Sequence, residues 1–213
     1  MVWMIKAGMP GNVNPESGEW LFIDVGFAQS GNKSCGLLSD TEPHARALTF
    51  EETAAYVIGR AGAESGGNST ALNLVVEAPL SVAFDREGNP FGRVFERLEG
   101  HQPRYWYMQG GWVVMMAAVY LLRALHDSTP RRRFRPSEGF VSFKPRGSRS
   151  RTARTFGLSV PLFMANRDLP AQFWLRPNWS PNTSERITSA FSVAGMNVGV
   201  PPVIRTLPAR VPK

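Results

Sequence analysis

The 213-residue chain is 43% hydrophobic and 11% aromatic, which supports one large domain with a real core. Its net charge of +7 favours a polyanionic partner. Cys35 is the single cysteine, which excludes an internal disulfide and leads us to expect a reducing, cytoplasmic location.

The first predicted element after a loose N-terminal arm (residues 1–18) is an antiparallel hairpin over residues 19–40. An apolar run reaches Asp24 and then breaks into glycine and small polar residues before a second apolar run returns. Asp24 therefore stands where the first strand leaves the core. No secretory signal is evident in the first residues.

A third strand over residues 45–50 is predicted to run directly into a helix. Thr49 is a good N-cap, and Glu52, three positions later, completes a capping-box pattern. The helix is predicted over residues 50–58 and is expected to fray in the glycine-rich stretch that follows.

The next strand, predicted over residues 71–79, repeats the design of the first. Its apolar run ends in one acid, Glu77, just before a strand-ending proline. Two buried strands that each expose one acid at the same end can bring two carboxylates together. Turn chemistry follows at residues 85–92.

The longest apolar segment is predicted to form a helix over residues 108–125. The eighteen uncharged residues 105–122 are of borderline length for a membrane span. Gln109 and two glycines shorten the continuous apolar part, which favours a buried core helix and makes a membrane partner unexpected. Because nearly every residue is apolar, the helix is predicted to be buried on most sides.

The last predicted elements are a strand over residues 138–144, a helix over residues 185–194, and a basic tail at residues 201–213. The complete order is strand, strand, strand, helix, strand, helix, strand, helix. It predicts a single α/β domain over residues 19–200, with helices packed on a mixed sheet that begins with a hairpin.

This order, with Asp24 on the first strand and Glu77 on the strand after the first helix, resembles the ribonuclease H-like superfamily. Within it, the segment 74–81 (LVVEAPLS), together with Arg93 and Glu96, is most similar to a branch of predicted nucleases. The resemblance implies a ribonuclease H-like fold and a divalent-metal-dependent nuclease.

The resemblance also implies which residues hold the metal. Asp24 and Glu77 match the first two acids of the family, and a third acid is expected on the last helix, which resembles that of Holliday-junction resolvase-like members. Ser189 stands where that aspartate is expected. Glu185, one helical turn earlier, is the substitute.

Magnesium or manganese is the cofactor that such a carboxylate set suits, because hard divalent cations prefer oxygen ligands. Two ions about 4 Å apart can activate water and stabilise the leaving oxygen of a phosphodiester. Each acid also has a simpler interpretation. Asp24 could bond its own backbone in a turn, and Glu77 could be an ordinary strand-end acid.

Two further acids are expected to have purely electrostatic roles. Glu96 is followed at once by Arg97, which favours a surface ion pair. Glu138 is surrounded by arginines in the sequence, which favours charge compensation over metal binding.

A basic segment at about 129–155 is predicted to be an insertion that binds nucleic acid. It carries nine cations against one acid, and such residues give salt-sensitive affinity for phosphate that is independent of sequence. A solvated basic loop, or a surface that grips acidic protein or ribosomal RNA, has the same pattern. The nine residues are Arg131, Arg132, Arg133, Arg135, Lys144, Arg146, Arg149, Arg151 and Arg154.

Three alternatives to the nuclease remain open. The first is a nucleic-acid-binding module that has lost catalysis, which the serine at position 189 favours. The second is a sugar-kinase or actin-like phosphate loop, which Asp24-Val-Gly and Lys33 resemble. The third is a subunit of a larger assembly, or a homodimer. P-loop and zinc-finger motifs do not occur in the sequence.

Overall fold

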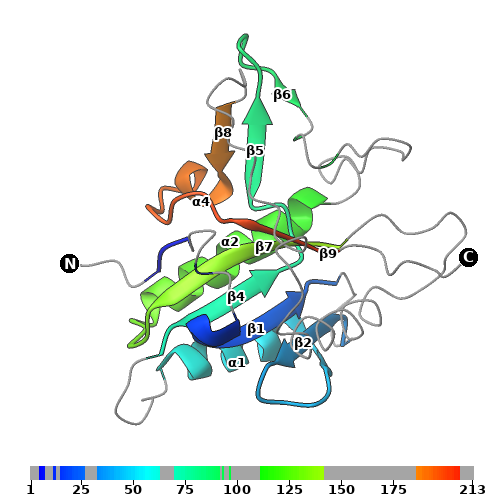
Figure 1. Ribbon diagram of the computed structural model, residues 1–213, viewed down its shortest axis with the longest axis vertical. Coiled ribbons are helices and arrows are strands. Elements are labelled where there is room, and N and C mark those ends of the chain that lie inside the picture. Colours follow the sequence, from blue (N-terminus) through cyan, green and yellow to red (C-terminus); the bar gives the residue numbers. More distant parts are fainter. Residues whose placement is uncertain are drawn as a thin grey trace, which may run out of the picture.

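The main body of the protein is a six-stranded mixed sheet with the strand order β3-β2-β1-β4-β7-β9 (Figure 1). The computed structural model describes residues 5–7, 12, 15–26, 33–62, 70–91, 93, 96, 111–141 and 186–206. The strands of this sheet are β1 (Glu19–Asp24), β2 (Cys35–Ser39), β3 (Arg46–Leu48), β4 (Leu72–Val76), β7 (Phe134–Val141) and β9 (Val203–Thr206). The α/β class and the mixed sheet are as predicted.

The pairing directions divide the sheet into two halves. β1, β2 and β3 pair antiparallel, which confirms the predicted hairpin and third strand. β1, β4, β7 and β9 pair parallel, so the carboxyl ends of these four strands share one edge of the sheet. A short 3₁₀ turn, η2 (Pro15–Ser17), precedes β1.

A second, three-stranded sheet is formed by β5 (Ser81–Phe84), β6 (Pro90–Phe91) and β8 (Arg186–Ser189), in the order β6-β5-β8. It lies above the main sheet in Figure 1. Only residues 77–80 connect β4 to β5, so the end of β4 is the junction between the two sheets.

The capping box predicted at Thr49 and Glu52 is confirmed and begins α1 (Phe50–Gly62). The Thr49 hydroxyl accepts a hydrogen bond from the Glu52 N–H at 3.1 Å, and the Glu52 carboxylate accepts one from the Thr49 N–H at 2.8 Å. Both groups satisfy N–H donors that a helix start leaves without partners. The helix continues four residues beyond the predicted end.

Successive side chains of the main sheet alternate between two faces. One face, which includes Ile23 and Val76, belongs to the core formed with α1 and α2 (Gly111–Asp127). Both helices lie behind the sheet in Figure 1. The opposite face carries Trp20, Phe22 and Asn73, which are also buried.

The prediction that the long apolar helix is buried on most sides is confirmed only in part, because one side of α2 is exposed. Trp112, Met116 and Tyr120 lie on one side of α2 and are 59%, 55% and 66% exposed. Apolar residues on both faces give no periodicity, so the sequence does not distinguish the covered side from the open one. Among the described residues, no helix has both the length and the apolar character needed to cross a membrane.

The predicted last helix over residues 185–194 is confirmed only at residues 190–193. Residues 186–189 form strand β8, which pairs antiparallel with β5, and only α4 (Ala190–Val193) is helical. The Ser189 hydroxyl accepts a hydrogen bond from the Phe191 N–H at 3.2 Å and caps α4. A partner strand about a hundred residues away overrides the local helical pattern.

Candidate functional site

The structure brings Asp24 and Glu77 together at the carboxyl edge of the main sheet. Asp24 is the last residue of β1, and Glu77 directly follows β4. Ile23 pairs with Val76, and the Glu77 N–H donates to the Ile23 carbonyl at 2.8 Å. The next residues along, Asp24 and Glu77, are therefore neighbours, with backbones about one strand spacing, ~4.8 Å, apart.

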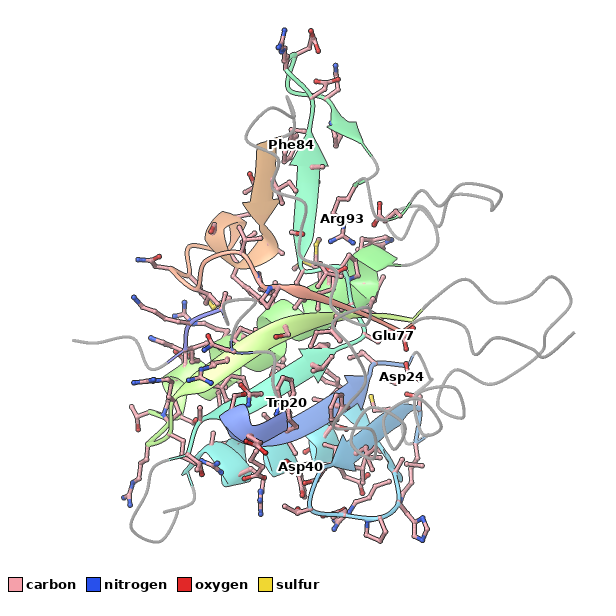
Figure 2. The ribbon with its side chains drawn as sticks, viewed as in Figure 1. Trp20, Asp24, Asp40, Glu77, Phe84 and Arg93 are labelled. Atoms are coloured by element: carbon pink, nitrogen blue, oxygen red, sulfur yellow. The ribbon has the colours of Figure 1, made fainter. Side chains whose placement is uncertain are left out.

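The two acids also share one face of the sheet. Side chains in register on parallel strands point the same way. Asp24 and Glu77 lie one position beyond Ile23 and Val76, which face the helices, so both acids are placed on the opposite face. Figure 2 shows both side chains beside one another at the same end of the sheet. Glu77 is buried, and Asp24 is partly exposed.

The segment after Asp24 is fixed by a close backbone approach at Gly26. A Cβ atom built on Gly26 would lie 2.1 Å from the Ser34 carbonyl oxygen, so only glycine fits there. The Ser34 hydroxyl donates to the Gly26 carbonyl at 3.2 Å. This contact joins the two ends of the hairpin loop near the acid pair.

A third acid does not join this pair within the described part of the chain, where no group of three His, Cys, Asp or Glu side chains could hold a metal ion. Glu185 lies outside the described residues. The helical turn that was expected to carry it toward Ser189 is strand β8 instead.

The sequence interpretation missed a buried cluster centred on Arg93. Arg93, Glu96 and Glu138 are 2%, 1% and 0% exposed. The predicted surface pair for Glu96 is therefore wrong, because this carboxylate is buried and binds Arg93 at 2.8 Å. Glu138 does compensate an arginine, at 2.7 Å, but the arginine is Arg93 and not one from the basic segment.

All five guanidinium N–H groups of Arg93 have an acceptor. The Nε–H and one NH2 hydrogen reach Glu96, at 3.1 and 2.8 Å. The remaining hydrogens reach Glu138, at 2.7 Å twice, and the Ser81 hydroxyl, at 2.9 Å. One cation thus serves two buried carboxylates, and burial raises the pKa of Glu96 although Arg93 opposes this.

The Arg93 cluster lies on the opposite side of the sheet from the acid pair. Glu138 is in register with Val76, which faces the helices. The local signal for the cluster is the i, i+3 spacing of Arg93 and Glu96. Their partnership with Glu138, 45 positions away, has no signal in a single sequence.

The arginines at the start of β7 lie at the other end of the sheet from the acids. Arg135 is in register with Asn73, four residues or about 13 Å before Glu77 along β4. Arg131 and Arg133, still earlier in the chain, are exposed. These described arginines therefore lie away from the acid pair.

Arg132 and Arg135 have partners within the protein. Arg132 is 4% exposed and binds the Glu19 carboxylate at 2.8 Å and the Thr70 carbonyl at 3.1 Å. Arg135 donates to the Ser17 carbonyl at 3.2 Å. The pKa of Arg135 is lowered, mainly by burial and to a smaller extent by the positive charge of nearby Arg133. The other five predicted phosphate-binding residues lie outside the described residues: Lys144, Arg146, Arg149, Arg151 and Arg154.

No family model, curated protein or solved structure matches this chain. The geometry of the acid pair and the charge of the chain are therefore the features that bear on its function.

Proposed function

We propose that the protein is a divalent-metal-dependent nuclease of ribonuclease H-like fold that hydrolyses phosphodiester bonds in nucleic acid. The observation that carries this proposal is the position of Asp24 beside Glu77, on one face and one edge of the sheet. The hairpin that leads the sheet and the helix between β3 and β4 support the fold assignment.

The donor set fits a hard cation. Asp24 and Glu77 offer carboxylate oxygens, which Mg²⁺ and Mn²⁺ prefer, and phosphate and water complete the coordination of such ions. When bound, the cation supplies Lewis acidity toward the phosphodiester and lowers the pKa of a bound water. Glu77 is the buried ligand of the proposed site, and Asp24 is the partly exposed ligand, which the nucleic-acid substrate would approach.

The charge of the chain supports a polyanionic substrate. A net charge of +7 attracts nucleic acid irrespective of sequence. Exposed Arg131 and Arg133 are the described residues proposed to contact phosphate, whereas buried Arg132 stabilises the fold through Glu19. The five basic residues that follow β7 remain predicted phosphate contacts.

The test is cleavage of single-stranded, duplex and branched substrates with and without Mg²⁺ or Mn²⁺. Asp24→Asn and Glu77→Gln should each lower the rate at least about 100-fold, since a ligand to a catalytic metal contributes several kcal/mol. Glu87→Gln is the matched control, because Glu87 is an exposed acid in the β5–β6 turn. Metal-dependent cleavage that survives Asp24→Asn would refute the mechanism.

A second function is favoured by one observation: among the described residues, no third His, Cys, Asp or Glu joins Asp24 and Glu77 in a group that could hold a metal ion. A nucleic-acid-binding protein without catalysis would keep the basic charge and lose the third ligand. Salt-dependent binding with no metal-dependent cleavage of any of these substrates would establish this alternative.

A further inference from the structure

The turn that follows Glu77 is fixed at each of its ends. On the β4 side, the Glu77 N–H binds the Ile23 carbonyl, and the Ala78 N–H binds the Val76 carbonyl, both at 2.8 Å. On the β5 side, the Leu80 N–H donates to Glu138 Oε2 at 2.8 Å. Glu77 therefore lies between the ladder of the main sheet and a buried carboxylate.

The Arg93 cluster continues this attachment into β5. Arg93 donates to the Ser81 hydroxyl at 2.9 Å and to both oxygens of Glu138 at 2.7 Å. Glu96 in turn accepts from the Arg93 backbone N–H at 2.9 Å. A single guanidinium thus links Ser81, Glu96 and β7. The cluster constrains the Leu80–Ser81 end of the segment 77–81, and the bond from Glu77 to Ile23 constrains the other end.

We propose that the Arg93 cluster is a positioning device for the acid pair, which fixes the segment 77–81 and thereby holds the Glu77 carboxylate beside Asp24. The metal-binding part of this inference rests on the proposed function. Arg93 and Glu138 are positioning residues here, because they act through the backbone that carries Glu77 and lie on the opposite face of the sheet.

The requirement for such a device follows from how Glu77 is placed. It lies one residue beyond β4, at the junction between two sheets, where its N–H still binds the Ile23 carbonyl but the residues that follow leave the main sheet. Metal ligands must be held within about 0.5 Å of their productive positions. The outer partners that orient ligands typically contribute about 10- to 100-fold to metal affinity.

The chain provides a matched control in Arg132. Both arginines are almost fully buried, and each binds a glutamate and a further acceptor. Arg93 binds Ser81 and Glu138 at the junction between the two sheets, whereas Arg132 lies at the opposite end of the main sheet. Lysine at either position keeps the charge but cannot reproduce the planar, multidentate geometry of arginine.

The first measurement is hydrogen exchange of the segment 77–81, which requires no metal. We expect Arg93→Lys to speed exchange in this segment while Arg132→Lys leaves it unchanged. Equal exchange in both variants, or unchanged exchange in Arg93→Lys, would overturn the positioning role. Circular dichroism checks that both variants fold. If Arg93→Lys does not fold, Ser81→Ala, which removes one of the bonds of Arg93, replaces it in the exchange measurement.

The second measurement is the affinity for Mn²⁺ alone, by calorimetry. We expect Arg93→Lys to weaken binding about 10-fold and Arg132→Lys to leave it at the wild-type value. Equal losses in the two variants would indicate a general effect of stability and would overturn the proposal. A wild type that binds no Mn²⁺ would refute the proposed function and the metal-site part of this inference, and exchange would still decide whether the cluster fixes the segment.

Discussion

Replacing Arg93 by methionine should destabilise the protein strongly and in a pH-dependent way. The substitution keeps a long apolar side chain and removes all five guanidinium donors. It leaves Glu96 and Glu138, which are both buried, on either side of the vacated position. Each carboxylate previously lay within 2.8 Å of a guanidinium nitrogen.

The magnitude follows from the burial of the partners. Removing one member of a buried ion pair costs about 3–5 kcal/mol, because an uncompensated charge remains. Arg93 serves two carboxylates, so we expect a loss in free energy of unfolding near the upper end, about 5 kcal/mol. For a chain of this length that loss lowers Tm by about 10–20 °C.

The pH dependence has a definite sign. Without Arg93, the buried Glu96 carboxylate, whose pKa burial already raises, binds its proton more tightly in the folded protein than in the unfolded chain. The folded state then carries more protons, so the free energy of unfolding falls as pH rises. The deficit of Arg93→Met should therefore be larger near pH 7 than near pH 5.

Urea unfolding at these two pH values measures both effects. The control is Arg46→Met, which removes an exposed ion pair with Glu42 and should cost no more than about 1 kcal/mol. If Arg93→Met cost as little as the control, or the same at both pH values, the buried-cluster argument would be refuted.

Three further perturbations test other parts of the structure. Thr49→Ala removes the N-cap of α1 and should lower the free energy of unfolding by about 1 kcal/mol in urea titrations; no change would mean that the capping bond contributes nothing. Burial raises the pKa of Asp40, so its ionised form destabilises the fold above pH ~3.8. Asp40→Asn should therefore raise Tm at neutral pH, and this gain should shrink as pH falls toward that value. A gain in Tm that is independent of pH would contradict this. Arg133→Ala should weaken the binding of long oligonucleotides and leave the affinity for a dinucleotide unaltered, because Arg133 lies more than about 13 Å from Glu77. Equal losses of affinity for both lengths would argue against a remote phosphate contact.

The parts of the fold that sequence could predict are those encoded by neighbouring residues. Thr49 and Glu52 lie three positions apart, and their capping box appears as expected. The apolar runs of the hairpin and of β4 end in Asp24 and Glu77, which identified both acids. Their adjacency depends on the parallel pairing of β1 with β4, which is compatible with the mixed sheet that the element order predicted.

The parts that sequence could not predict depend on distant partners. Residues 186–189 form a strand because β5 pairs with them, although their local pattern suits a helix. Arg132 stands among exposed arginines in the sequence but is buried against Glu19, which lies 113 positions earlier. The environment of Glu96 likewise depends on Glu138, at the carboxyl half of another strand.

The central position of β4 also determines how the chain must fold. Both neighbours of β4 run parallel to it, so each pairing must wait for a long crossover connection to close. The connection from β1 to β4 contains α1, and the connection from β4 to β7 contains α2. Such non-local closure is entropically costly before any contact is gained, and domains of this kind refold on a timescale of about milliseconds to seconds. Asp24 and Glu77 therefore meet only once β1 and β4 have paired. If the pair binds metal as proposed, the appearance of Mn²⁺ affinity during refolding would report the assembly of the sheet in real time.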